Sequence, residues 1–319
     1  MARPEINDPP PPEVQSDLDS LTASLDTAIP RKQTGANLLI ATWNLRSFAS
    51  LTRNWTAQES DSPKRDLRGL RAVCEIVPRF DVVALQEVKG DLRALRDTMR
   101  YLGPHWAFLM TDVTAGSAGN DERMALVFDL TRLKPSGLAC ELVVPQEWLD
   151  EISPDALTRQ FARTPYAVSF LAGRTTFILV TLHIDYAQPA QGRIPELRAI
   201  ARSMAEWAKR ASDWEHNLLT LGDFNIDRHG DDLWRAFTST GLTVPDDIQK
   251  VPRTVFSNPA KPNLAKFYDQ IAWFRGNGMD LLSMQYHQGG SFDFVAHVYR
   301  NTGLNKTAIS YRISDHYPL

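Results

Sequence analysis

Ser314-Asp315-His316, close to the end of the printed chain, is the stretch around which the sequence is organised. Three other stretches each place small polar or acidic side chains directly after an apolar run that is typical of a buried strand. They are Thr42-Trp43-Asn44, Leu85-Gln86-Glu87 and Gly222-Asp223-Phe224-Asn225. Four such strand ends predict one pocket in which oxygen ligands surround a hard divalent cation, with an imidazole beside it.

The 319-residue chain has an ordinary globular composition, with 43% hydrophobic and 23% charged residues. Because the four stretches extend from Asn44 to His316, the pocket requires one large domain, which we place at residues 38–319. Residues 1–37 form a proline-rich tail. Apolar residues at spacings of three and four between Val14 and Ile29 predict a short amphipathic helix there, which either packs on the domain or stays disordered.

Charge and cysteine content limit the class of protein. The net charge of −3 excludes the global basic field of a strong nucleic-acid binder, although an enzyme that cuts nucleic acid needs positive charge only at the phosphate.

No apolar run reaches the ~20 residues of a membrane span, so we expect no stable membrane insertion. The N-terminus lacks the pattern of a secretory signal. Cys74 and Cys140 are expected to be free thiols, which favours a cytoplasmic protein.

Strand and helix patterns alternate from residue 38 onward. Helices are predicted over residues 66–77, 91–102, 195–214 and 231–240. Strands are predicted over residues 38–43, 81–87, 106–110, 124–128, 138–144, 166–171, 175–182, 218–221, 268–274, 281–286 and 296–299. Long loops are expected at 116–121 and 145–159. This mixture predicts an α/β (α+β) fold with two sheets packed face to face and helices outside.

The order of these motifs, with Thr-Leu-His-Ile at 181–184 and Tyr-Asp-Gln-Ile at 268–271, resembles the endonuclease/exonuclease/phosphatase superfamily. Locally the sequence is most similar to the deoxyribonuclease I-like branch, and the resemblance extends from Leu38 to the end of the chain. It implies a four-layered α/β sandwich, in which two packed mixed β-sheets are flanked by helices. It also implies phosphoester hydrolysis with Mg²⁺, or Mn²⁺, as cofactor.

The resemblance gives the acidic and amide residues separate roles. Glu87 binds the metal directly, Asn44 helps to hold it, and Asp315 faces it. Taken alone, Asn44 is more typical of a turn residue. Asp223 orients or deprotonates the attacking water or binds a second metal, and Asn225 holds a phosphate oxygen.

Two histidines are implied on opposite sides of the phosphate, an arrangement that suits in-line displacement. His316 acts as general base or stabilises the transition state, and it pairs with Asp269. The family commonly has a histidine where this chain has Gln270. His183 pairs with Glu122 and protonates the leaving oxygen or supports the phosphate.

Basic side chains lie near these positions in the sequence. By resemblance Arg46 touches backbone phosphate, and Arg123 follows the acidic residue at 122. Lys89 stands where the branch has an arginine, so it keeps the charge without the bidentate fork. An aromatic residue that stacks on the sugar in that branch is replaced here by Asn120. For Arg163, phosphate binding is favoured over a surface ion pair.

We therefore expect a divalent-metal-dependent phosphodiesterase with DNA as substrate, an endonuclease of low sequence specificity that works by in-line attack of water. A phosphatase or phospholipase that acts on a phosphoinositide, sphingomyelin or a small nucleotide is the second hypothesis, because it uses the same metal site. A non-catalytic binding module on this fold is the third. It is disfavoured, because a scaffold has no reason to keep acidic groups that repel one another without metal. The sequence identifies no protein partner or inhibitor.

Overall fold

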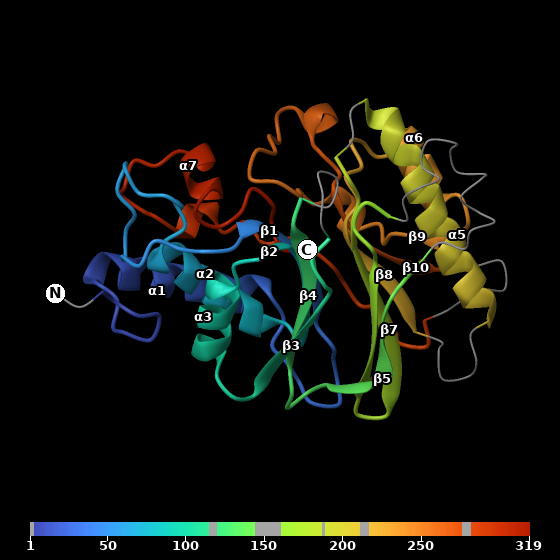
Figure 1. The fold of residues 1–319 in the computed structure, drawn as a ribbon, viewed down its shortest axis with the longest axis horizontal. Helices are drawn as coiled ribbons and strands as arrows, with labels where there is room; N and C mark the ends of the chain where they lie inside the picture. The colour runs from blue at the N-terminus through green and yellow to red at the C-terminus, as the bar shows by residue number, and fades with distance from the viewer. Residues whose placement is uncertain (1–2, 115–119, 144–160, 187–188, 211–216, 276–281) are drawn as a thin grey trace.

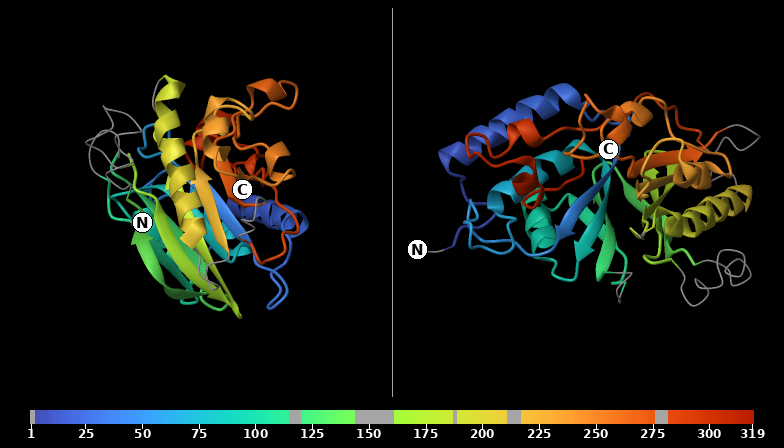
Figure 2. Two further views of the ribbon diagram at one scale, coloured as in Figure 1. Left: turned by 90° about the vertical axis from the view of Figure 1, so that its right-hand side faces the viewer. Right: turned by 90° about the horizontal axis from the view of Figure 1, so that it is seen from above.

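The computed structural model describes residues 3–114, 120–143, 161–186, 189–210, 217–275 and 282–319. Two β-sheets lie face to face in the middle of the molecule, and helices cover both outer faces (Figure 1). The view from above in Figure 2 separates the same four layers. The predicted four-layered sandwich of two mixed sheets with flanking helices is confirmed.

The first sheet has the strand order β1-β2-β4-β3, and the second has the order β5-β6-β7-β8-β10-β9. The strands of the first sheet are β1 (Ile40–Phe48), β2 (Val82–Lys89), β4 (Glu122–Asp129) and β3 (Trp106–Met110). Those of the second are β5 (Lys134–Glu141), β6 (Tyr166–Ala172), β7 (Thr175–His183), β8 (Leu218–Asp223), β10 (Asp269–Phe274) and β9 (Leu242–Thr243). The pairs β1–β2 and β7–β8 are parallel, and the other pairs are antiparallel.

The helices divide between the two outer layers (Figures 1 and 2). On the side of the first sheet lie α2 (Leu67–Ile76), α3 (Arg93–Leu102) and α7 (Lys306–Ser310), and α1 (Pro12–Ala28) packs against α2. On the second lie α5 (Ile194–Arg210) and α6 (Asp232–Thr238). Single 3-10 turns occur at Val77–Arg79, Ala190–Arg193, Ile248–Lys250, Pro262–Leu264 and Val295–His297. In the part of the chain that the structure describes, no helix combines the length and apolarity needed to cross a bilayer.

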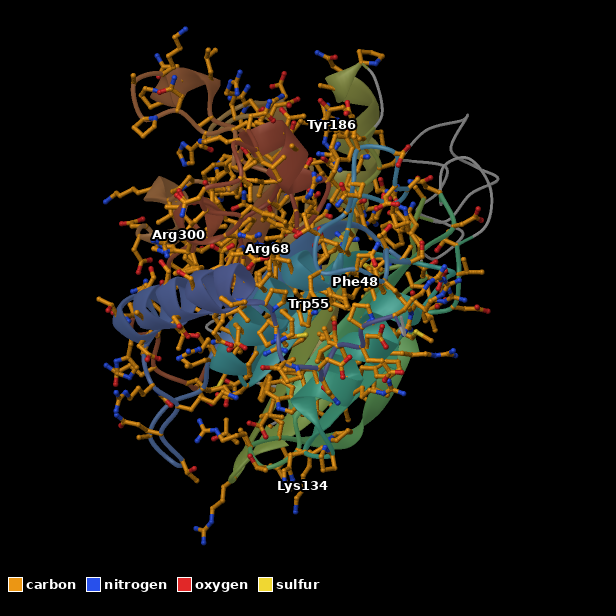
Figure 3. The ribbon with its side chains drawn as sticks, turned by 90° about the vertical axis from the view of Figure 1, so that its left-hand side faces the viewer. Phe48, Trp55, Arg68, Lys134, Tyr186 and Arg300 are labelled. Atoms are coloured by element: carbon orange, nitrogen blue, oxygen red, sulfur yellow. The ribbon has the colours of Figure 1, made fainter. Side chains whose placement is uncertain are left out.

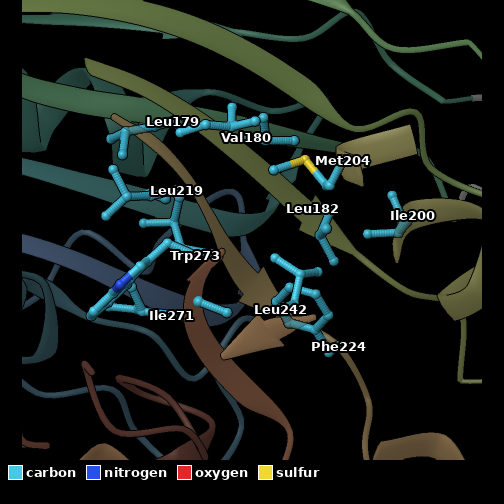
Figure 4. Packing of buried hydrophobic residues seen from close by; sticks show 14 of the residues in the cluster. Leu179, Val180, Leu182, Ile200, Met204, Leu219, Phe224, Leu242, Ile271 and Trp273 are labelled. Atoms are coloured by element: carbon cyan, nitrogen blue, oxygen red, sulfur yellow. The ribbon is translucent and has the colours of Figure 1, made fainter. Parts of the chain in front are cut away.

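Strand β2 explains how the layers hold together. Val82 and Ala84 belong to the hydrophobic cluster between the sheets, whereas Val83 and Leu85 belong to the cluster under the helices of the first sheet. Successive side chains of a strand point to opposite faces, so an uninterrupted apolar run is what a strand buried on both sides requires. Figure 4 shows the packing on both faces of the second sheet. Val180 and Leu182 of β7 lie beside Ile200 and Met204 of α5, whereas Leu219 of β8 and Ile271 and Trp273 of β10 lie on the opposite face.

The helix expected in the N-terminal tail forms and packs on the rest of the chain. Val14, Leu18 and Leu21 on α1 are buried. A buried ion pair of 2.7 Å between Asp17 and Arg68 joins α1 to α2. Of the two states considered for this segment, the structure contains the packed one.

Two predicted strands are wrong where the structure describes them. Residues 282–286 form no strand, because the side-chain oxygen of Asn217 accepts the backbone N–H groups of Ser283 and Met284 at 2.7 and 3.1 Å. Residues 296–299 contain part of a 3-10 turn followed by Tyr299 at φ 51°, a conformation that a strand does not allow.

Several predictions differ from the structure only in their bounds or lie outside the described residues. Strand β5 begins and ends earlier than residues 138–144. The end of the helix predicted over 195–214, most of the loop at 116–121 and all of the loop at 145–159 lie outside the described residues.

Candidate active site

One row of side chains crosses three neighbouring strands at one edge of the second sheet. Asp223 ends β8, and it is in register with His183 at the end of β7 and with Asp269 at the start of β10. Residues that are directly opposite on adjacent strands project to the same face. The sheet register therefore brings together three residues that are far apart in the sequence.

Gly222 allows β8 to approach β7 closely beside this row. Its φ is 148°, and a Cβ atom at this position would lie 2.0 Å from the backbone oxygen of Leu182. Only glycine fits both the conformation and the space. The backbone conformation and the close packing of β7 and β8 thus require glycine at this position of the Gly-Asp-Phe-Asn motif.

Asp223 lies at the centre of the site and is 2% exposed. Its Oδ2 accepts a hydrogen bond from Asn44 Nδ2 at 3.0 Å. The same oxygen lies 3.7 Å from His183 Nε2 and 3.9 Å from His316 Nε2. The structure therefore brings the two predicted histidines to one carboxylate oxygen.

The first sheet contributes Asn44 from β1 and Glu87 from β2. The side-chain nitrogen of Asn44 donates to Glu87 Oε1 at 2.9 Å as well as to Asp223. Glu87 has a φ of 60°, and its Oε2 accepts the backbone N–H of Ser47 at 2.7 Å. The carboxylates of Glu87 and Asp223 therefore both accept from the amide of Asn44. Carboxylate oxygens are ligands that a hard divalent cation prefers.

His316 is paired with Asp269, as the family resemblance implies. Its Nδ1 lies 2.7 Å from Asp269 Oδ2, and the ring of Tyr268 stacks on the imidazole at 5.7 Å. Burial lowers the pKa of His316, but the charge and hydrogen bond of Asp269, together with the charge of Asp223, raise it overall to about 10. His316 is therefore a cation at neutral pH in this arrangement.

Glu122 fixes the other histidine from the opposite sheet. Its Oε2 lies 3.0 Å from His183 Nδ1 and 2.7 Å from Arg163 Nε, while its Oε1 accepts from Lys89 Nζ at 2.8 Å and from the side chain of Asn120. Burial raises the pKa of Glu122, but the hydrogen bond and charge of His183, followed by Arg163 and Lys89, lower it overall to about 2. The carboxylate is ionised and binds Nδ1, which leaves Nε2 of His183 facing Asp223.

The predicted phosphate-binding cations contact protein groups. Arg46 Nη1 lies 3.1 Å from Asp315 Oδ2 and donates to Ser310 Oγ at 2.7 Å. Arg123 donates to the backbone oxygen of Lys89 at 3.5 Å. Arg163 and Lys89 contact the carboxylate of Glu122, as described above.

Asn225 adopts a φ of 48° directly after the Asp-Phe pair. Its side-chain nitrogen donates to the backbone oxygen of Ile184 at 2.7 Å, and its backbone N–H donates to Asp223 Oδ1 at 2.9 Å. Asn225 therefore holds both Asp223 and the loop after β7 in place.

Sequence reasoning did not single out Glu196, near the start of α5. Its two carboxylate oxygens accept the backbone N–H groups of Ala162 and Asp185 at 3.1 and 3.2 Å. It thus ties together the segments that carry Arg163 and His183. Burial raises the pKa of Glu196 to about 7. No motif marks this residue, because a glutamate in the first turn of a helix is common for local reasons.

The model of the Endonuclease/Exonuclease/phosphatase family matches residues 41–316, which are most of the chain. The chain belongs to this family. This match confirms the resemblance that was inferred from the short motifs. Members of the family are phosphoester hydrolases. The match contains every site residue named above.

One curated relative is named deoxyribonuclease and comes from Thioalkalivibrio sp. (strain K90mix). It is 27% identical over 201 residues, which cover 61% of this chain and 48% of the relative. The matched segment therefore spans about half of the relative's length.

Solved structures with a similar fold include a functionally unknown conserved protein from Enterococcus faecalis V583, with 15% identity and a TM-score of 0.57. They also include a mannosyl-6-phosphatase from Bacteroides thetaiotaomicron VPI-5482, with 18% identity and a TM-score of 0.56. Each match covers 88% of this chain and 97% of the other. At this identity the similarity establishes the fold.

Proposed function

We propose that this member of the family is a divalent-metal-dependent phosphodiesterase that cuts DNA with low sequence specificity. The observation that carries the proposal is the position of Asp223 Oδ2, which lies within 4 Å of the Nε2 atoms of both His183 and His316. In-line displacement at phosphorus needs one group to prepare the water and another to serve the leaving oxygen. Two imidazoles around one carboxylate supply such groups.

The carboxylates of Glu87 and Asp223 would hold the Mg²⁺ or Mn²⁺ ion together with Asn44. The amide of Asn44 would turn its oxygen towards the ion, because its nitrogen donates to both carboxylates in this structure. Asp315 is the fourth proposed ligand, although its Oδ2 also accepts a hydrogen bond from Arg46. When bound, the ion neutralises charge on the phosphate and on the departing oxygen.

A second set of residues also satisfies the distances of a metal centre. One ligand atom each from Asp223, Asp269 and His316 lie within 4.8 Å of one another. The 2.7 Å hydrogen bond between Asp269 and His316 already uses one atom of each residue. For this reason we place the cation beside Glu87 and Asn44.

The charges of the site suggest how the catalytic roles are divided. His316 is held as a cation by Asp269, so we assign it to the negative charge of the phosphate. Asp223 is assigned to accept the proton of the attacking water. His183, whose Nδ1 faces the carboxylate of Glu122, is assigned to donate a proton to the leaving oxygen. Asn225 holds Asp223. Phosphate binding by Arg46, Lys89, Arg123, Arg163 and Asn225 stays a prediction.

The choice of DNA is supported by the Thioalkalivibrio relative that is named deoxyribonuclease. One observation favours a smaller phosphoester as the second candidate. Arg46 and Lys89 are both paired with carboxylates, which reduces the positive charge available to a polyanion. A phosphatase or phospholipase that acts on a phosphoinositide, sphingomyelin or a small nucleotide would need less of that charge.

Supercoiled plasmid incubated with the protein in Mg²⁺ buffer, with and without EDTA, tests the proposal. We expect nicking that EDTA abolishes and that Glu87→Gln and His316→Ala each reduce by about a hundredfold or more. Unchanged nicking by either variant would contradict its assigned role. If plasmid stays intact while a phosphoinositide, sphingomyelin or nucleotide is hydrolysed, the second candidate replaces the first.

Cys74 and Cys140 are free thiols in the structure. On this ground we propose that the protein works in the reducing cytoplasm. Cell fractionation measures the location directly, and a disulfide in the isolated protein would contradict the proposal.

A further inference from the structure

Two exposed tyrosines border the candidate active site, and each has an arginine guanidinium over its ring. Tyr186 is 48% exposed, with Arg193 lying 4.4 Å from the ring centroid. Tyr311 is 52% exposed, with Arg46 at 4.0 Å. Exposed aromatic rings usually have several rotamers, and a stacked guanidinium restricts them without covering the whole ring.

Tyr186 is connected to the catalytic row through one further ring. It lies perpendicular to Tyr268, with centroids 6.2 Å apart, and Tyr268 in turn stacks on His316. Figure 3 shows Tyr186 at the end of the molecule opposite Lys134, which begins β5. Tyr186 therefore belongs to the end of the sandwich that carries the site.

Tyr311 reaches the site from the C-terminal segment. Its stacked arginine, Arg46, also contacts Asp315 at 3.1 Å. Asp315 directly precedes His316, so this second ring adjoins the site from a different part of the chain. The two tyrosines thus approach the catalytic row along separate segments, one after β7 and one after α7.

We propose that Tyr186 and Tyr311 are stacking platforms for two nucleobases, one on each side of the scissile phosphate. Stacking needs a base whose face is free, and in a duplex the neighbouring bases already cover both faces. The inferred substrate is therefore a single-stranded or locally unpaired nucleic acid. The inference rests on the proposed phosphodiesterase activity, because it names the substrate class of the same site.

Preorganised rings suit this role energetically. A tyrosine that is already held by an arginine loses little rotamer freedom when a base stacks on it. Base–aromatic stacking tolerates any sequence, since every base has a π-face. The platforms would therefore add affinity for a strand without sequence preference.

Steady-state kinetics on a single-stranded oligonucleotide, in Mg²⁺ buffer, test the inference. We expect Tyr186→Ala and Tyr311→Ala each to raise KM about tenfold and to change kcat by less than about threefold. Tyr186→Phe and Tyr311→Phe keep the rings and should stay within about twofold of wild type. Tyr286→Ala is the matched control, since Tyr286 is 36% exposed and packs on Trp273 at the opposite end of β10.

A strand with tetrahydrofuran abasic sites in place of bases separates stacking from a structural effect. Wild type should bind this strand more weakly, and the alanine variants should bind it no worse than wild type does. Equal losses on both strands, or a fall in kcat with KM unchanged, would mean that the rings only position Tyr268 or Asp315. Either result overturns the inference.

The two proposals fail in different ways. If wild type hydrolyses bis(4-nitrophenyl) phosphate or duplex DNA in an EDTA-sensitive reaction but does not prefer the unpaired strand, the stacking inference is wrong and the phosphodiesterase proposal stands. If it hydrolyses no phosphodiester, both are wrong. Competition by unlabelled single-stranded and abasic octamers in EDTA measures binding without hydrolysis, and equal competition would again overturn the inference.

Discussion

The 3.0 Å contact between Glu122 Oε2 and His183 Nδ1 joins the two sheets of the sandwich, because Glu122 begins β4 in the first sheet and His183 ends β7 in the second. It spans the interface at the edge that carries the candidate active site. The carboxylate is buried and ionised, so its charge affects both the stability of the fold and the orientation of the imidazole.

Glu122→Gln is expected to destabilise the protein in a pH-dependent way. The folded-state pKa of about 2 lies below the ordinary 4.5, so the ionised carboxylate stabilises the fold above about pH 4.5, and this stabilisation is lost as pH falls towards 2. We expect a loss of about 3 kcal/mol at pH 7 and less than half of that at pH 3. Urea denaturation at both pH values measures it. The exposed Glu59→Gln is the control, and an equal loss at both pH values would point to packing instead of ionisation.

Glu196→Gln should have the opposite pH dependence. Burial raises the folded-state pKa of Glu196 to about 7, above the ordinary 4.5, so wild type loses stability as pH rises from about 4.5 to 7. The glutamine variant loses no stability by ionisation. Its melting temperature relative to wild type should therefore be higher at pH 8 than at pH 5. A difference that does not change with pH would show that Glu196 ionises normally.

Binding of Mg²⁺ should stabilise the folded protein. A ligand that binds only the folded state at a hundred times its dissociation constant adds about 2.7 kcal/mol. We expect Mg²⁺ to raise the melting temperature relative to EDTA in wild type, and to have little effect in Glu87→Gln. Differential scanning fluorimetry with and without Mg²⁺ makes the comparison. An equal response of Glu87→Gln would remove Glu87 from the proposed donor set.

Gly222→Ala should be strongly destabilising, by roughly 3 kcal/mol or more, because the added Cβ would meet the backbone of β7 and not a flexible side chain. Gly290→Ala is the matched control, since a Cβ there meets nothing within 4 Å. Chemical denaturation of both variants tests the contrast. Similar stabilities would mean that β7 and β8 separate at little cost.

The sequence predicts the parts of the site that follow directly from strand ends. Asn44, Glu87 and Asp223 each come after an apolar run. Such a run can be recognised as a buried strand from the sequence alone, without knowledge of the tertiary structure. The four-layered sandwich follows from the same runs and from the family resemblance. The pairing of His316 with Asp269 was implied by that resemblance.

Contacts between loops could not be predicted. The ion pair of Arg46 with Asp315 and the two hydrogen bonds to Glu196 depend on the course of segments that have no periodic pattern. The strand predicted over residues 296–299 failed for a related reason. Its alternation of residue types was real, but the backbone turns at Tyr299.

The register between β7, β8 and β10 makes the geometry of the site depend on how these strands align. Because three site residues sit opposite one another on adjacent strands, a slip of one residue in β8 would turn Asp223 away from both of its neighbours at once. The site residues therefore come together only when the three strands are correctly aligned. A compact chain with misaligned strands would keep its secondary structure and have no activity. The specific activity of a preparation would therefore report the fraction of molecules whose strands are correctly aligned.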